Sequence, residues 1–147
     1  MTDLADRWLG IDYGEVRVGV AVSDPLGYTD RGVETIRWNG QDMTRVITRI
    51  IELIRQYDVK GIVVGVPRRT DGKAGASEDK ARELASELEK NSGISVVLRD
   101  ERYTTVLASR VMRETGVSRD RRKNIVDQIA AEIILQEYME TRRKGIN

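Results

Sequence analysis

Hydrophobic and polar positions alternate near the start of the chain, a pattern typical of β-strands. Strands are predicted over residues 8–13, which are mostly apolar, and over 16–23, which alternate, and a short turn joins them at 13–15. In the second segment, one side carries Val16, Val18, Val20 and Val22, and the other carries Arg17, Gly19, Ala21 and Ser23. A third strand is predicted over 32–37, so the three strands are expected to form an antiparallel meander.

The pattern then changes to a helical period. In residues 41–57, apolar positions recur every three or four residues, at Met43, Val46, Ile47, Ile50, Ile51, Ile54 and Tyr57. This spacing predicts an amphipathic helix. The next segment, 61–67, is apolar without a break, which is typical of a buried parallel strand, and a loop rich in turn residues follows over 68–75.

Two more helices and a strand are expected in the second half. Ser77 is predicted to cap a helix that ends at Gly93, and a strand follows over 94–99. A helix is then expected from Thr104 or Thr105 to about Glu114, and a last helix over about 123–142. The order β-β-β-α-β-α-β-α-α indicates an α/β fold, a five-stranded mixed sheet with helices on both faces. The short connections favour one domain over residues 1–147.

Composition narrows the possible chemistry. The chain has no cysteine and no histidine, which excludes thiolate and imidazole metal ligands and a histidine base. A bound metal would need oxygen ligands, which favours Mg²⁺, Mn²⁺ or Ca²⁺. No apolar run approaches the roughly 18 residues that span a membrane. The N-terminus does not resemble a signal peptide, so the chain is expected to be cytoplasmic.

Carboxylates occupy three places where packing alone would not put them. Asp12 ends the first strand, Asp100 and Glu101 follow the fifth strand, and Asp127 lies near the start of the last helix. Asp127 shares one helical face with Ala131, Ile134 and Tyr138, so this face is expected to pack on the sheet. Each acid alone also fits a structural role, as a surface residue, a turn residue or a partner of the helix dipole.

The three positions together predict more than each does alone. In open α/β sheets, functional sites gather outside the carboxyl ends of the strands. Carboxylates that converge there repel one another, and cations are needed to offset their charge. Two divalent ions about 4 Å apart have this role in phosphodiester-cleaving enzymes, where they activate water and stabilise the leaving oxygen.

Four sequence blocks, in this order, resemble the signature blocks of one family. They are GIDYGEVRVGVAVSD, VVGVPRRTDGKAG, DERYTT and KNIVDQIAAEIILQEYM. From about Trp8 to Tyr138, the chain resembles the YqgF family, also called RuvX. Its members are bacterial RNase H-like proteins described as pre-16S rRNA nucleases and Holliday-junction resolvases. The first block alone would also fit actin-like ATPases, but 147 residues leave no room for the second domain of those proteins.

The resemblance implies an RNase H-like fold, hydrolysis of phosphodiester bonds, and a two-metal site with Mg²⁺ or Mn²⁺. It implies that Asp12, Glu101 and Asp127 are the catalytic residues and the metal ligands. Adjacent strand residues face opposite sides of a sheet, so spacing alone does not choose between Asp100 and Glu101. Glu101 is taken because the family motif centres on it, and Asp100 is the second choice. Lys73 stands in the DGKAG loop where a serine is more usual, which would alter substrate contacts but not the metal site.

Basic residues near the acids are candidates for phosphate binding. Arg17, Arg68, Arg102 and Lys123 are predicted to bind substrate, because guanidinium and ammonium groups bind phosphate oxygens. Arg17 and Arg102 fit a salt bridge to a neighbouring carboxylate about equally well. Lys123 ends a basic stretch that starts at Arg110, and on charge alone this stretch would also fit a solvated loop.

The predicted function is that of a metal-dependent nuclease that processes the 5′ end of the 16S rRNA precursor in ribosome biogenesis. Two alternatives stay open. One is a Holliday-junction resolvase that acts on DNA with the same acids, and the other is an assembly factor that binds pre-rRNA without cutting it. Nucleic acid is the expected partner, no membrane is involved, and the protein is expected to be a monomer or a homodimer.

Overall fold

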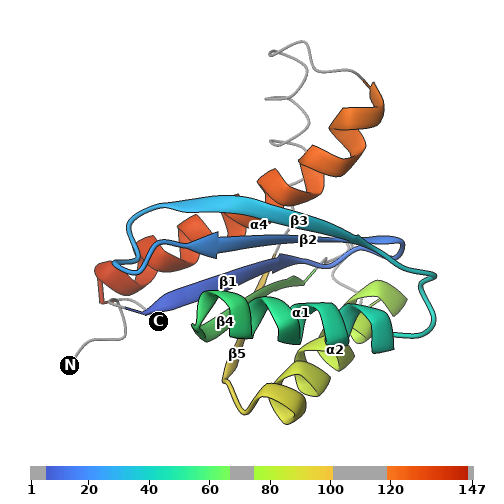
Figure 1. The fold of residues 1–147 in the computed structure, drawn as a ribbon, viewed down its shortest axis with the longest axis horizontal. Helices are drawn as coiled ribbons and strands as arrows, with labels where there is room; N and C mark the ends of the chain where they lie inside the picture. The colour runs from blue at the N-terminus through green and yellow to red at the C-terminus, as the bar shows by residue number, and fades with distance from the viewer. Residues whose placement is uncertain (1–5, 67–74, 101–118, 146–147) are drawn as a thin grey trace.

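The computed structural model of the chain describes residues 6–66, 75–100 and 119–145. One sheet holds the five described strands in the order β3-β2-β1-β4-β5 (Figure 1). The strands are β1 (Arg7–Asp12), β2 (Arg17–Ser23), β3 (Asp30–Arg37), β4 (Val59–Val66) and β5 (Val96–Asp100). The β1–β2 and β2–β3 pairs are antiparallel, and the β1–β4 and β4–β5 pairs are parallel. The predicted meander and mixed sheet are therefore confirmed.

The described helices lie on both faces of the sheet, as predicted. They are α1 (Thr44–Tyr57), α2 (Ala76–Ser92) and α4 (Arg119–Arg143). Figure 1 shows α1 and α2 on one face and α4 along the other, with the first turns of α4 extending past the sheet. The helix predicted from Thr104 or Thr105 to about Glu114 lies outside the described residues. Among the described residues, no helix has the length and apolar character needed to cross a membrane.

The face under α1 and α2 carries a broad apolar core. Val18, Val20 and Val22 point into it, as the alternation in β2 predicts, whereas Val16 before the strand is 55% exposed. The sheet contributes further side chains that are fully or almost fully buried, and the helices cover them with Ile50, Leu53, Leu84 and Leu88. Burial of each such side chain contributes roughly 1.5–3 kcal/mol, so this face supplies much of the hydrophobic stabilisation.

The face under α4 is packed through small residues. A Cβ added to Gly10 in β1 would lie 2.7 Å from the Cβ of Leu135 and 2.8 Å from the carbonyl oxygen of Ala131. The apolar cluster on this face consists of Ala21, Val63, Ala131, Ile134, Leu135 and Met139. Glycine and alanine therefore let the α4 backbone lie directly against β1 and β2.

Three helix starts differ from the prediction. Ser77 is not the N-cap of α2, because that helix begins at Ala76 after Gly75, and the Ser77 hydroxyl instead donates to the Glu15 carboxylate. The residues before α1 form a turn in which the Asn39 side chain accepts two backbone N–H groups, which delays that helix to Thr44. Helix α4 begins at Arg119, four residues earlier than predicted.

Candidate active site

Asp12 is the last residue of β1, and its side chain is only 5% exposed. Its register partners are Gly19 on β2 and Gly65 on β4. The side chains of alternate residues share a face of the sheet, so Asp12 lies on the same face as Gly10, which is the face that α4 covers. A buried carboxylate needs a compensating partner. The sequence prediction that Asp12 sits at a strand end, within an apolar run, is confirmed.

Asp127 reaches the same place from α4. A Cβ added to Gly19 would collide with the Asp127 carbonyl oxygen and would lie 2.9 Å from the Asp127 Cβ. Because Gly19 is the direct cross-strand partner of Asp12, this packing sets Asp127 beside Asp12 on one face. Asp127 lies more than two turns into α4, so a role as a partner of the helix dipole, which needs the first turn, is excluded.

Two arginines compensate the buried charge of Asp127. Arg17 donates from Nε to Oδ2 of Asp127 at 2.7 Å, and the Asp127 side chain is 13% exposed. Burial raises the pKa of Asp127, whereas the hydrogen bond and charge of Arg17 and the charge of Arg37 act to lower it. The salt bridge that was one of the two expectations for Arg17 is therefore present, and its predicted contact with substrate remains a prediction.

Arg37 was not among the predicted site residues. It is the register partner of Arg17 at the end of β3, so both side chains lie on the α4 face, near Asp127. Its position in the sequence carries no signal of this kind, because the cross-strand register depends on the long turn between β2 and β3. Knowledge of that register would have identified it, since Arg17 was already a candidate.

The middle acid was predicted as Glu101, with Asp100 as second choice. Asp100 ends β5 beside Val66, and the Val66 side chain belongs to the core under α1 and α2. Parallel register partners share a face, so Asp100 lies on the face opposite to Asp12. Its neighbour Arg99 confirms the alternation, because its guanidinium approaches Thr141 and Tyr138 of α4. Glu101 lies outside the described residues.

The remaining predicted substrate-binding residues are Arg68, Arg102 and Lys123. Arg68 and Arg102 lie outside the described residues. Lys123 lies in the second turn of α4, but its side chain is also outside what the structure describes. Their predicted contacts with phosphate therefore stay predictions.

The donor chemistry of the described part of the site suits Mg²⁺ or Mn²⁺. Asp12 and Asp127 bring two carboxylates, one from the sheet and one from the helix, to one face of β1 and β2. Carboxylate oxygens are the ligands that these hard cations prefer. Within residues 6–66, 75–100 and 119–145, no group of three acidic side chains forms a metal site. The third predicted ligand, Glu101, falls outside these ranges.

Comparison with known proteins agrees with this chemistry. Residues 6–141 match the model of the RuvX family, which is described as Holliday junction resolvase. A protein of Acetivibrio thermocellus named "Putative pre-16S rRNA nuclease" is 45% identical over 139 residues, which are 94% of this chain and 98% of that one. A protein of the same name from Listeria monocytogenes is 42% identical over 135 residues, 92% of this chain and 98% of that one.

Solved structures resemble the fold at much lower identity. Thermus thermophilus RuvC in complex with a Holliday junction substrate has a TM-score of 0.62 at 16% identity and covers 97% of this chain and 98% of that chain. The Fowlpox virus resolvase bound to Holliday junction DNA has a TM-score of 0.51 at 13% identity, with 92% and 98% covered. At these identities the likeness concerns the fold, and it confirms the predicted RNase H-like fold.

Proposed function

The chain belongs to the RuvX family and is a nuclease, and on this premise we propose that it cuts the 16S rRNA precursor near its 5′ end in the cytoplasm. We propose Asp12, Glu101 and Asp127 as the catalytic acids that hold Mg²⁺ or Mn²⁺. The names of the relatives that are 42–45% identical over nearly the whole chain support the RNA substrate.

One observation carries the proposal. Asp12, which is buried, and Asp127 lie on the same α4 face because Gly19 lets the helix backbone lie against β2. Arg17 and Arg37 offset part of the charge of Asp127, but two carboxylates on one glycine-lined face still each pay a desolvation penalty. A divalent cation held by both acids would offset the charge of both.

The residues of the chain have distinct tasks in this mechanism. Divalent ions held by Asp12, Glu101 and Asp127 would supply the chemistry that activates water for in-line attack and offsets charge on the leaving oxygen. Asp12 and Asp127 supply ligand oxygens from a rigid strand and a rigid helix, which fixes their relative position. Arg17 and Arg37 place two guanidinium groups beside Asp127, where they hold phosphate oxygens of the substrate and favour the ionised form of the carboxyl.

The test is cleavage of a pre-16S 5′-leader RNA and of a four-way DNA junction with Mg²⁺ or Mn²⁺. Wild type is compared with Asp12→Asn and with Asp58→Asn, a control that makes the same chemical change at a side chain that is 82% exposed. Asp58 adopts a left-handed conformation with φ 53°, which asparagine also tolerates. RNA cleavage that Asp12→Asn abolishes and Asp58→Asn retains is the expected result. Full metal-dependent activity in Asp12→Asn would overturn the assignment.

Holliday-junction resolution is the second candidate, because the description of the family names it. This reaction requires two paired active sites, so it predicts a homodimer in solution and cleavage of the junction in preference to the RNA. Light scattering together with the two-substrate assay separates the candidates. Binding of the RNA without cleavage of either substrate would instead identify an assembly factor that holds pre-rRNA.

A further inference from the structure

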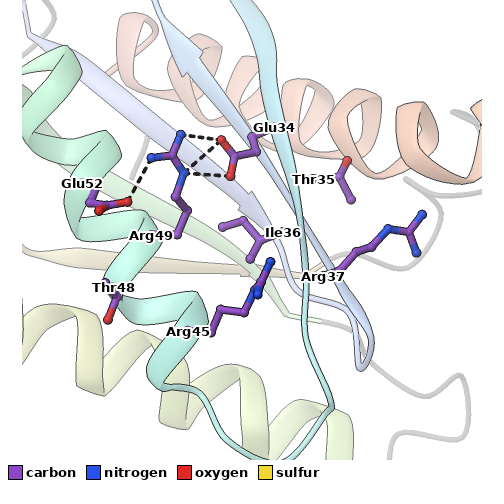
Figure 2. Close-up of a pocket in the computed structure, with 8 residues that line it drawn as sticks. All are labelled: Glu34, Thr35, Ile36, Arg37, Arg45, Thr48, Arg49 and Glu52. Atoms are coloured by element: carbon purple, nitrogen blue, oxygen red, sulfur yellow. Dashed lines mark hydrogen bonds and ion pairs between the residues drawn. The ribbon is translucent and has the colours of Figure 1, made fainter.

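A polar pocket of about 550 Å³ lies between the edge strand β3 and helix α1. Figure 2 shows its lining, with Arg45 extending from α1 toward β3 and Arg49 bridging Glu34 and Glu52. A second hollow of about 430 Å³ adjoins it and shares Arg37 and Arg45. The two hollows form one groove, the β3–α1 groove, which reaches the end of β3 where Arg37 pairs with Arg17.

The acids of this groove are already engaged within the protein. Arg49 donates from Nε and Nη2 to both carboxylate oxygens of Glu34, at 2.7 to 3.0 Å, and from Nη1 to Glu52. Asp42 accepts the backbone N–H of Thr44 at the start of α1, and this hydrogen bonding lowers its pKa. The exposed guanidinium of Arg45 has no such partner among the described residues. The lining holds three arginines and three carboxylates and is formally neutral, so Arg45 is the guanidinium that the groove offers to a ligand.

The groove connects to the active site around the end of β3. Ile36 and Glu34 face α1, whereas Arg37 faces the other side of the strand, as Figure 2 shows. There Arg37 is paired in register with Arg17, which holds Asp127. Arg17, Arg37 and Arg45 thus form a series of three cations that leads from the catalytic acids, over the open edge of the sheet, into the groove.

We propose that the β3–α1 groove binds the sugar-phosphate backbone of the RNA strand that flanks the cut site, with Arg45 as a phosphate ligand. This inference rests on the proposed nuclease function and defines where the substrate leaves the active site. Guanidinium groups spaced along a path bind successive phosphates without reading sequence. A strand that follows this path covers several nucleotides beyond the scissile bond.

The experiment measures RNA affinity in an Asp12→Asn background, in which the RNA is not cut. Single-stranded RNAs of about 4 and about 16 nucleotides represent the range of lengths that single-strand sites cover. Arg45→Gln is compared with Arg55→Gln, an exposed arginine about 15 Å further along the same helix, so both variants lose one charge from α1. Arg45→Lys keeps the charge and tests whether charge suffices.

For the longer RNA, we expect Arg45→Gln to weaken binding about tenfold, as for the loss of one charge-assisted hydrogen bond. The slope of log affinity against log salt should fall by about 0.7, the value for one phosphate of a single strand. Arg45→Lys should keep most of that slope, and the shorter RNA should bind all variants alike.

Equal losses of RNA affinity in Arg45→Gln and Arg55→Gln would contradict RNA binding in the β3–α1 groove, because affinity would then follow net charge alone. The proposed function fails separately. If the long RNA binds through Arg45 but the wild type cuts no RNA with Mg²⁺ or Mn²⁺, RNA binding in the groove is supported and cleavage of pre-rRNA is contradicted. If the wild type cuts the RNA and Arg45→Gln binds it normally, only the binding role of the groove is contradicted.

Discussion

The two faces of the sheet are built by different rules. On the face under α1 and α2, large branched side chains from strands and helices interlock, and nearly all of them are fully buried. On the face under α4, glycine and alanine in the strands allow the helix backbone to pack closely against them. Carboxylates such as that of Asp12 are buried on this face instead of large apolar side chains. Both faces belong to the same five-stranded sheet.

This difference fits a division in which one face supplies most of the stability and the other carries the proposed active site. A well-packed apolar layer tolerates no buried charge, but a close helix-to-strand contact through glycine holds a carboxylate at a fixed place on a rigid support. Two acidic residues on the α4 face, Asp127 and Asp30, differ in whether neighbouring charges offset the cost of burying an ionised carboxylate. Arg17 and Arg37 offset the burial of Asp127, whereas Glu132 adds to the cost of ionising Asp30.

The largest expected effect comes from comparing substitutions of Asp100 and of its neighbour Glu101. Asp100 lies on the α1–α2 side, so Asp100→Asn should change the cleavage rate by no more than about twofold. We predict that Glu101→Gln lowers it by at least about 100-fold, the upper range for removing support from a metal site. Single-turnover cleavage of the leader RNA measures both. A larger loss in Asp100→Asn would reverse the assignment of the faces.

A second pair of substitutions separates stability from activity. Leu53→Ala, in the core under α1, should cost about 2–5 kcal/mol of unfolding free energy and leave the cleavage rate per folded molecule unchanged. Gly19→Ala should cost about 1–3 kcal/mol through overpacking and should also lower that rate, because it pushes Asp127 away from Asp12. Urea unfolding and cleavage assays under native conditions measure the two effects. Normal activity in a destabilised Gly19→Ala would contradict the proposed geometry.

Asp30, on the α4 face, should make the free energy of unfolding depend on pH. Burial, and then the charge of Glu132, raise the pKa of Asp30 from 3.8 to about 7. The folded state therefore binds this proton more tightly than the unfolded state, and the free energy of unfolding falls as pH rises from about 4 to 7. Asp30→Asn should remove this fall and stabilise the protein at pH 8 by about 1–2 kcal/mol, after allowance for solvent screening.

Urea unfolding of wild type and Asp30→Asn at pH 5 and pH 8 tests this. At pH 5 the difference should be less than half of that at pH 8, since the unfolded carboxyl is already ionised at pH 5 while the folded carboxyl is still protonated. Asp58→Asn is the control, because it makes the same chemical change at a side chain that is 82% exposed. A loss of stability in Asp30→Asn at pH 8 would show that the ionised carboxylate has a favourable partner.

The smallest expected effect concerns the compensation of Asp127. Arg17 lowers the pKa of this carboxyl by hydrogen bond and charge, against the larger effect of burial. Arg17→Gln should therefore raise the pKa of Asp127 further in the metal-free protein. Carbon NMR of the aspartate carboxyl groups across pH measures it, with Asp127→Asn for assignment and Arg55→Gln as the charge-matched control. A pKa that falls or stays unchanged would contradict the ion pair.

The local patterns of the chain predicted most of the fold. The alternation of β2 fixed which side chains enter the core, and the spacing of Asp127, Ala131 and Ile134 identified the face of α4 that packs on the sheet. Both predictions succeed because the period of a strand or helix directly determines which residues share a face. The acids Asp12 and Asp127 could be identified for the same reason.

Features that depend on register or on side-chain competition could not be predicted in this way. Arg37 joins the site only through its pairing with Arg17 across a turn of unknown geometry. Ser77 was expected to be a cap, but its hydroxyl is used by Glu15, sixty-two residues earlier in the chain. The face on which Asp100 lies depends on the pairing of β5 with β4, which places Asp100 beside Val66.

Metal binding is the most direct test of the claim that the acids on the α4 face form one site. Calorimetric titration of Mn²⁺ into the wild type, Asp12→Asn, Asp127→Asn and Asp58→Asn compares three identical losses of charge at different places. We predict that Asp12→Asn and Asp127→Asn each weaken Mn²⁺ binding at least about tenfold, while Asp58→Asn binds like the wild type. Equal affinity in all four proteins would contradict a shared metal site at Asp12 and Asp127.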